Sequence, residues 1–131
     1  MSRLEGKVAV VTGAMQGIGA GISTVLARHG AHVVLTDISD KVAETAGRIN
    51  EDGGSASSKI IDVTNPDQVT EAFKEISEEH GRVDILVNNA GIYPRKKLVE
   101  MDESYMQLMF NINIFGTFRC SKAVLPSMME R

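Results

Sequence analysis

The chain has 131 residues, of which 43% are hydrophobic and 24% charged, and its formal net charge is −3. These values are ordinary for one globular domain with its own core. The slightly acidic balance argues against nucleic acid as a partner. Because the sequence contains no apolar run of about 18 residues and no apolar signal core, we expect no membrane span and a cytoplasmic location.

A glycine-rich turn near the start is the strongest local pattern. Val8 to Val11 is an apolar run typical of a strand that is covered on both faces. Residues 12–19 follow with Gly13, Gly17 and Gly19, and they lead into apolar residues at helical spacing. A strand, a tight turn and a helix N-terminus can bind the pyrophosphate of a dinucleotide, because backbone approaches the phosphates and free N–H groups face them. Glycines at turns often serve backbone geometry alone, so the glycines by themselves are weak evidence. The strand before them and the helix after them are the context that supports a dinucleotide site.

Strands alternate with helical stretches along the rest of the chain. We expect strands at residues 7–11, 32–37, 57–63 and 83–87, and helices at about 17–29, 40–50, 66–80 and 102–129. Pro126 is expected to bend or end the last helix. This alternation predicts an α/β fold, a doubly wound parallel sheet of the Rossmann type. About four strands in the order 3-2-1-4 would form half of such a sheet.

A carboxylate ends the second predicted strand. Asp37 stands about 20 residues beyond the glycine turn, where it can accept hydrogen bonds from both adenosine ribose hydroxyls and would repel a 2′-phosphate. The alternative is an exposed acid that caps the next helix. Gln16 and Ile38 stand where basic residues would favour a 2′-phosphate. We therefore expect NAD in preference to NADP.

Polar and small residues also follow the third and fourth strands. Asp62 could bind the adenine amino group while the N–H of Val63 meets a ring nitrogen, although such an acid often only caps a helix. Residues 88–91, Asn-Asn-Ala-Gly, would let a flat cofactor lie against the backbone while the amides tie strand ends together. The alternative for this segment is an ordinary Asn-Gly type of turn.

Together these motifs resemble the short-chain dehydrogenase/reductase family, and Asn113 to Gly116 is similar to its Asn-x-x-Gly segment. The resemblance spans nearly the whole chain and implies hydride transfer between a nicotinamide and an alcohol or carbonyl substrate. The implied cofactor-binding residues are Gly13, Gln16, Gly17, Ile18 and Gly19 at the turn, Asp37 at the ribose, Asp62 and Val63 at the adenine, and Asn89, Ala90 and Gly91 at the nicotinamide half. Asn113 would order a water in the proton relay, or would only hydrogen-bond helix backbone.

The family's catalytic residues are a tyrosine, a lysine four residues after it and a serine upstream of it. All three follow a fifth strand, and we expect this chain to end before that strand. Tyr93 and Lys97 have the right spacing, but Pro94 argues against the helix that would align them. The basic run 95–97 is expected to be a solvated loop, with substrate contact the lesser alternative. The chain would then be an inactive cofactor-binding half with a bare fourth strand. The alternatives are a complete non-catalytic dinucleotide-binding module and a half-protein that assembles with another chain.

The histidines, the cysteine and the last helix are expected to have structural roles. The three histidines lack zinc spacing, so we expect no metal site. Cys120, the single cysteine, rules out an internal disulfide and is expected to be buried. The resemblance implies that the last helix packs in a subunit interface, so a complete enzyme would be a homo-oligomer. The methionines of this helix fit that use, although a stripe facing the core is the alternative.

Overall fold

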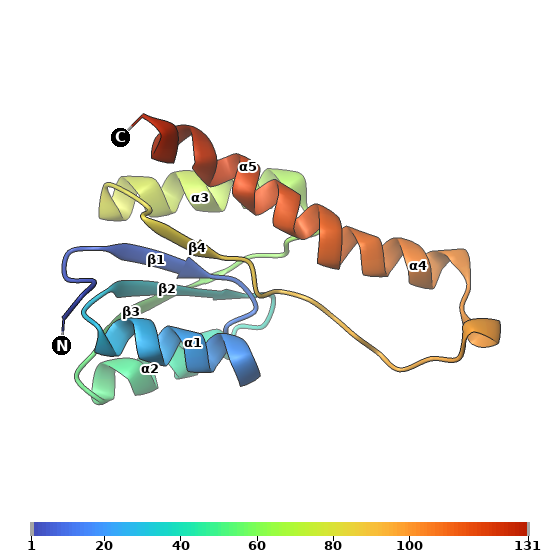
Figure 1. The fold of residues 1–131 in the computed structure, drawn as a ribbon, viewed down its shortest axis with the longest axis horizontal. Coiled ribbons are helices and arrows are strands. Elements are labelled where there is room, and N and C mark those ends of the chain that lie inside the picture. Colours follow the sequence, from blue (N-terminus) through green and yellow to red (C-terminus); the bar gives the residue numbers. More distant parts are fainter. Residues whose placement is uncertain (1, 131) are drawn as a thin grey trace.

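The computed structural model describes residues 2–130 and contains a parallel sheet with helices on both faces (Figure 1). The strands are β1 Val8–Val11, β2 His32–Asp37, β3 Ser55–Ile60 and β4 Ile85–Val87. They lie in the order β3-β2-β1-β4, and every neighbouring pair is parallel. The predicted fold class and strand order are therefore confirmed.

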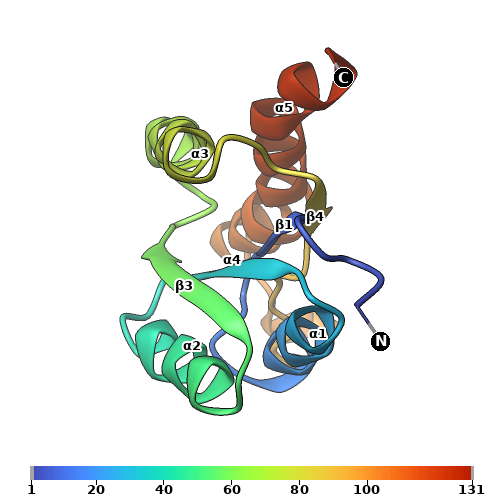
Figure 2. The ribbon, with the colours of Figure 1, turned by 90° about the vertical axis from the view of Figure 1, so that its left-hand side faces the viewer.

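The helices form a layer on each face of the sheet. They are α1 Gly17–Arg28, α2 Val42–Glu51, α3 Pro66–His80, α4 Glu103–Phe110 and α5 Gly116–Met129, with a 3-10 segment η1 Leu98–Glu100 and a π-helical segment η2 Asn111–Phe115. Helices α1 and α2 cover one face, and α3 and α5 cover the other, as the end-on view confirms (Figure 2). None of the helices within residues 2–130 is long and apolar enough to cross a membrane.

Alternate residues of β1 enter different cores, which explains its uninterrupted apolar sequence. Val8 and Val10 pack in the cluster that includes residues of α3 and α5. Ala9 and Val11 pack in the cluster that includes residues of α1 and α2. A strand with both faces buried has no polar side to show, as expected at the centre of a parallel sheet.

Three predicted strands have different bounds in the structure. β1 begins at Val8, one residue later than predicted. β3 begins at Ser55 and ends at Ile60, so the prediction of residues 57–63 was wrong at both ends. It stops where β2 stops, since Asp37 pairs with Ile60. β4 begins at Ile85 rather than at residue 83. Just before it, the carboxylate of Asp84 accepts a hydrogen bond from the N–H of Val8 at 2.8 Å, and the N–H of Asp84 donates to the carbonyl oxygen of Val8 at 2.8 Å.

The long C-terminal helix is continuous but not uniform. Helices α4 and α5 are joined through η2, and the three form one rod that projects beyond the sheet (Figure 1). Pro126 lies inside α5, which continues to Met129, so proline does not end the helix. The loop of residues 91–101 swings away from the sheet before it returns to α4 (Figure 1).

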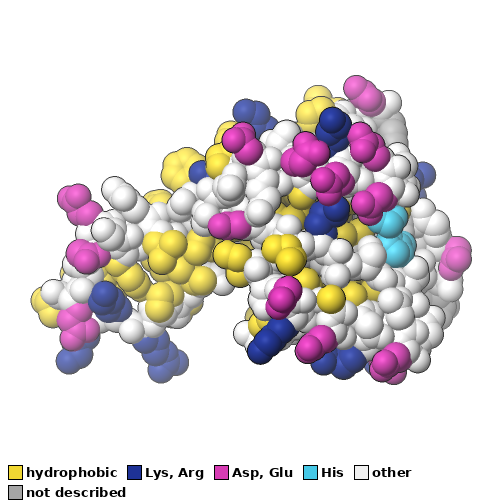
Figure 3. Space-filling view, turned by 180° about the vertical axis from the view of Figure 1, so that it is seen from behind, with side chains coloured by type: hydrophobic (Ala, Val, Ile, Leu, Met, Phe, Trp, Pro, Cys, Tyr) yellow, Lys and Arg dark blue, Asp and Glu magenta, His cyan; other side chains and the backbone are white. Residues whose placement is uncertain are grey.

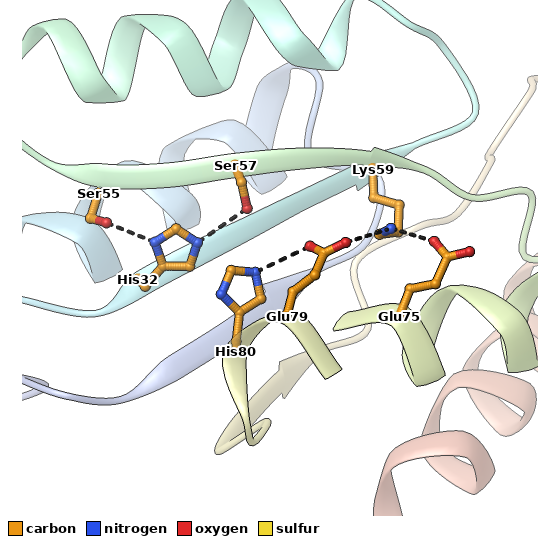
Figure 4. A network of polar contacts seen from close by, with 7 residues as sticks. All are labelled: His32, Ser55, Ser57, Lys59, Glu75, Glu79 and His80. Atoms are coloured by element: carbon orange, nitrogen blue, oxygen red, sulfur yellow. Dashed lines mark hydrogen bonds and ion pairs between the residues drawn. The ribbon is translucent and has the colours of Figure 1, made fainter. Parts of the chain in front are cut away.

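A polar network fixes α3 over the edge strand β3 (Figure 4). Lys59 pairs with Glu75 at 2.6 Å and with Glu79 at 3.6 Å. Nε2 of His80 lies 3.7 Å from the carboxylate of Glu79. The ring centroids of His80 and His32 are 4.5 Å apart. The two ring nitrogens of His32 lie 2.7 Å and 3.1 Å from the hydroxyls of Ser55 and Ser57. Polar and charged groups along an edge strand discourage pairing with other chains.

Candidate functional site

The glycine turn connects β1 to α1 in a conformation that requires glycine. Gly13 and Gly17 have φ values of 62° and 60°, which side-chain-bearing residues rarely adopt. A Cβ atom at Gly13 would also lie 2.8 Å from Cα of Ala90. A Cβ atom at Gly19 would lie 2.5 Å from the carbonyl oxygen of Gly13 and 2.5 Å from Nδ2 of Asn89. The glycines therefore allow the turn, the helix and the end of β4 to pack closely together.

The N-terminus of α1 is open to an anion. Gln16 is the N-cap residue and makes no capping hydrogen bond, and the first turn contains no acidic residue. Ile18, in this first turn, is 76% exposed. The free N–H groups and the positive end of the helix dipole therefore face outward at the turn.

Thr12 joins the ends of β1 and β4. Its side chain is buried, and Oγ1 accepts hydrogen bonds from the backbone N–H groups of Asn89 at 3.1 Å and Ala90 at 2.9 Å. Nδ2 of Asn89 donates to the carbonyl oxygen of Gly13 at 3.0 Å. The Asn-Asn-Ala-Gly segment is thus held against the glycine turn, and the predicted tie between strand ends is present.

Asp37, at the end of β2, supports the same turn. Its Oδ2 accepts a hydrogen bond from the N–H of Met15 at 3.1 Å, and its Oδ1 accepts one from the N–H of Ser39 at 3.1 Å. Thr45, on α2, donates from Oγ1 to the carbonyl oxygen of Met15 at 2.6 Å. Both backbone polar groups of Met15 are therefore held by side chains from the neighbouring βα unit.

Asp62 and Val63 follow β3 rather than ending it. Oδ1 of Asp62 accepts hydrogen bonds from the N–H of Thr64 at 2.9 Å and from its hydroxyl at 2.7 Å. The carbonyl oxygen of Val63 accepts a hydrogen bond from Arg119 of α5 at 3.0 Å. A Cβ atom at Gly116 would lie 2.8 Å from Cγ2 of Val63, so glycine allows α5 to approach this segment.

Asn113 lies in the π-helical segment and binds the chain that leaves β4. Its Oδ1 accepts a hydrogen bond from the N–H of Ile92 at 2.9 Å, and its Nδ2 donates to the carbonyl oxygen of Ile92 at 2.9 Å. A Cβ atom at Gly91 would lie 2.7 Å from Oδ1 of Asn113. Its amide therefore holds a loop of the sheet edge instead of its own helix backbone. Single π-helical turns are frequent at functional sites.

These elements enclose a cavity of about 440 Å³ at the carboxyl ends of the strands. It brings together most of the predicted cofactor-binding residues: Gly13, Gln16, Ile18, Asp37, Asp62, Val63, Asn89, Ala90 and Gly91. Gly17 and Gly19 belong to the same turn but lie outside the lining. Ligands bind at this edge in open α/β sheets.

Some residues around this cavity were not predicted from the sequence. The additional lining residues are Met15, Thr36, Ile61, Ile92 and Ile112. Ile38, which the sequence placed near the 2′ position of the ribose, also lines the cavity. Several of them directly follow a strand or a predicted site residue, so their position relative to the strand ends was an available signal. Thr45 carries no such signal, because it lies 30 residues from Met15 in sequence.

The structure also places the other residues that the sequence singled out. Tyr93 is 88% exposed and lies in the loop of residues 91–101, so it does not share a helix face with Lys97. Cys120 is fully buried, and burial raises the pKa of its thiol to about 11, which suits packing and not reactivity. Within residues 2–130, no group of three or more His, Cys, Asp or Glu side chains could hold a metal ion.

A four-stranded parallel sheet in this order, with a glycine turn after β1 and an acid at the end of β2, defines an α/β protein of the Rossmann type. Comparison with known proteins gives the family. The model of the short chain dehydrogenase family matches residues 7–131, and the chain belongs to this family.

Similar proteins include a curated oxidoreductase and two oxidoreductases of known structure. The chain is 41% identical over 131 residues to the oxidoreductase UcpA of Escherichia coli K12, covering 100% of this chain and 50% of that protein. A hydroxysteroid dehydrogenase from Escherichia coli superposes with a TM-score of 0.92 at 35% identity, over 98% of this chain and 55% of that one. A metagenomic short-chain oxidoreductase in complex with NADP gives a TM-score of 0.91 at 35% identity, over 97% and 58%. The chain thus spans about half the length of the relatives it matches.

Proposed function

We propose that the cavity at the carboxyl edge of the sheet binds NAD, and that the chain is the cofactor-binding part of an oxidoreductase acting on an alcohol or carbonyl group. The observation that carries this proposal is the convergence of the glycine turn, Asp37 and the Asn89–Gly91 segment on one cavity. In this assignment the pyrophosphate lies against Gly13, Gln16, Gly17, Ile18 and Gly19. The uncapped N-terminus of α1 supports it, because phosphate binds well to free N–H groups at a helix N-terminus.

The preference for NAD rests on Asp37. Its carboxylate lines the cavity and each oxygen keeps lone pairs beyond its single backbone hydrogen bond, so both ribose hydroxyls can be accepted. A 2′-phosphate at the same place would meet a negative charge. Gln16 and Ile38, which also line the cavity, offer no compensating cation. Since one solved relative holds NADP, family membership does not decide the cofactor, and these local residues support the choice.

The remaining residues are assigned along the cavity. We place Asp62 and Val63 beside the adenine and Asn89, Ala90 and Gly91 beside the nicotinamide half. Asn113 acts in this proposal as a positioning residue, because both polar atoms of its side chain are bonded to Ile92. It would hold the loop that borders the nicotinamide end.

We further propose that residues 1–131 form one dinucleotide-binding domain to which a fifth strand would add beside β4. β4 carries Ile85, Leu86 and Val87 at the edge of the sheet, in contrast to the polar edge strand β3. We expect the chain alone to show no dehydrogenase turnover, and the complete enzyme to be a homo-oligomer. Exposed apolar side chains along the projecting rod support an interface there (Figure 3): Leu108, Phe110, Ile114, Phe115 and Phe118.

Thermal unfolding with each cofactor tests the proposal. NAD is expected to raise the melting temperature more than NADP does at equal concentration, because a ligand stabilises the folded state according to its affinity. Equal protection by the two would overturn the role of Asp37. Protection by neither would overturn the cavity as a dinucleotide site. Turnover that disappeared in Tyr93→Phe would show that the rejected Tyr93 and Lys97 pair is catalytic.

A further inference from the structure

A second cavity lies on the projecting arm, separate from the one assigned to the dinucleotide. It has a volume of about 550 Å³ and is formed between the loop of residues 91–101 and α4. Its lining residues are Tyr93, Pro94, Arg95, Lys96, Met101, Tyr105, Met106 and Met109. Most of these side chains are apolar. Among the described residues that line the cavity, none is aspartate or glutamate.

Specific contacts hold the loop of residues 91–101 against α4 at this cavity. The hydroxyl of Tyr105 donates to the carbonyl oxygen of Pro94 at 2.8 Å, which joins the loop to α4. The ammonium of Lys96 stands 4.9 Å from the centre of the Tyr105 ring, in a cation–π arrangement. Met101, Tyr105 and Met109 are half-buried. The cavity therefore combines a structured apolar floor with two cations at its rim.

The second cavity adjoins the nicotinamide end of the proposed cofactor site. Met109, one of its lining residues, has its sulfur 3.9 Å from Nδ2 of Asn113. Asn113 in turn holds Ile92, which lines the first cavity, and Tyr93 follows Ile92 directly into the second. A molecule seated in the second cavity would therefore extend toward the reacting end of the cofactor.

We propose that this cavity is a substrate subsite for an anionic amphiphile, a small molecule with an apolar chain that ends in a carboxylate or phosphate. The methionines and Tyr105 would contact the apolar chain, and Arg95 and Lys96 would pair with the anionic end. Methionine suits such a site because its flexible, polarisable side chain adapts to chains of different shape. The nearby acids Glu100, Asp102 and Glu103 are absent from the lining, and Asp102 accepts a hydrogen bond from the N–H of Tyr105 at 2.8 Å. The role as a substrate subsite rests on the proposed function, whereas binding of the amphiphile can be measured without it.

The methionines report on the two cavities separately. Met15 lines the cofactor cavity, whereas Met101, Met106 and Met109 line the second. With ¹³C-methyl-labelled methionine, addition of NAD is expected to shift the Met15 signal, and addition of octanoate or octyl phosphate is expected to shift Met101, Met106 and Met109. Octanol, which has the same chain without the charge, is expected to bind about fivefold more weakly at low salt, the size expected for two exposed charge pairs. The difference should shrink as salt is added.

Two variants decide the role of the cations. The double variant Arg95→Gln, Lys96→Gln should bind octanoate no better than octanol and should leave the NAD-induced shift of Met15 unchanged. Lys122→Gln is the matched control, because Lys122 also stands over an aromatic ring, 5.8 Å from that of Phe118, but lies on α5 outside the cavity. Equal binding of octanoate and octanol by the unaltered chain would overturn the proposal, as would shifts confined to Met15 or Met128. In a further outcome, NAD would not shift the Met15 signal while octanoate shifted the signals of Met101 and Met109. That result would overturn the cofactor assignment and would still support the amphiphile site.

Discussion

Asp37 accepts a hydrogen bond from the backbone N–H of Met15 at 3.1 Å, so the carboxylate assigned to the ribose also holds the glycine turn in place. Thr45 fixes the opposite side of the same residue by donating to its carbonyl oxygen at 2.6 Å. The pyrophosphate and ribose parts of the proposed site are therefore mechanically linked through one residue. A change at Asp37 should affect both the choice of cofactor and the rigidity of the turn.

Asp37→Asn tests this link. The amide keeps one oxygen acceptor, so only one of the two backbone hydrogen bonds of Asp37 can persist, and the negative charge is lost. We expect NAD binding to weaken about tenfold, or ~1.4 kcal/mol, with NADP binding unchanged or improved. Isothermal titration with each cofactor measures the ratio. Asp40→Asn removes a charge from a nearby exposed carboxylate and should leave the ratio unaltered. An unaltered ratio in Asp37→Asn would contradict the assignment.

Gly13→Ala should destabilise the protein and abolish cofactor binding. Alanine at a φ of 62° is strained, and its Cβ would lie 2.8 Å from Cα of Ala90. We expect a loss of about 2 kcal/mol or more in the free energy of unfolding, measured with urea. Gly21→Ala is the matched control in α1, because its Cβ would meet nothing within 4 Å. That variant should be about 0.5–1 kcal/mol more stable, since alanine favours helix over glycine. Similar stabilities for the two variants would show that the turn tolerates a side chain.

Thr12→Val separates hydrogen bonding from packing at the strand ends. Valine has nearly the same shape as threonine but leaves the N–H of Ala90 without its acceptor, while the N–H of Asn89 keeps only the carbonyl oxygen of Val87. We expect a loss of about 1–2 kcal/mol in the free energy of unfolding, because a donor that is shielded from water and left unpaired is costly. Thr12→Ser keeps the acceptor and should lose less. Hydrogen exchange at the amides of Asn89 and Ala90 should accelerate only in the valine variant, and equal exchange in both would contradict the role given to Oγ1.

The strand order could be predicted because apolar runs such as Val8–Val11 alternate with clear helix signals, for example Asn65-Pro66 and Gly81 around α3. The bounds of β3 could not be predicted as well, because an edge strand beginning Ser-Ala-Ser-Ser has little apolar pattern and is defined by its pairing with β2. Each predicted strand end could be assigned a ligand-facing role from sheet geometry alone. Contacts between residues far apart, such as Thr45 with Met15 or Asn113 with Ile92, depend on how helices pack and leave no local signal.

The paired rings of His32 and His80 predict a fall in stability at acidic pH. Burial, and secondarily the charge of His80, lowers the pKa of His32 from its usual 6.5. As the pH falls below 6.5, His32 therefore takes up its proton more readily in the unfolded chain than in the folded chain. The stability contributed by neutral His32 is complete above pH 6.5, and it is lost as the pH falls toward and through the pKa of His32 in the folded chain. The carboxylate of Glu79 lies 3.7 Å from Nε2 of His80.

His80→Gln should raise the pKa of His32 part of the way back, since it removes the neighbouring charge but not the burial. The variant should then lose less stability between pH 7.5 and pH 5.5 than the unaltered protein. Proton NMR of the His32 ring measures its pKa directly, and urea unfolding at the two pH values measures the stability. His29→Gln, at the third histidine, should leave the pKa of His32 where it is. A His32 ring that titrates identically in His80→Gln and in the unaltered chain would show that burial alone sets its pKa and that the two rings are not electrostatically coupled.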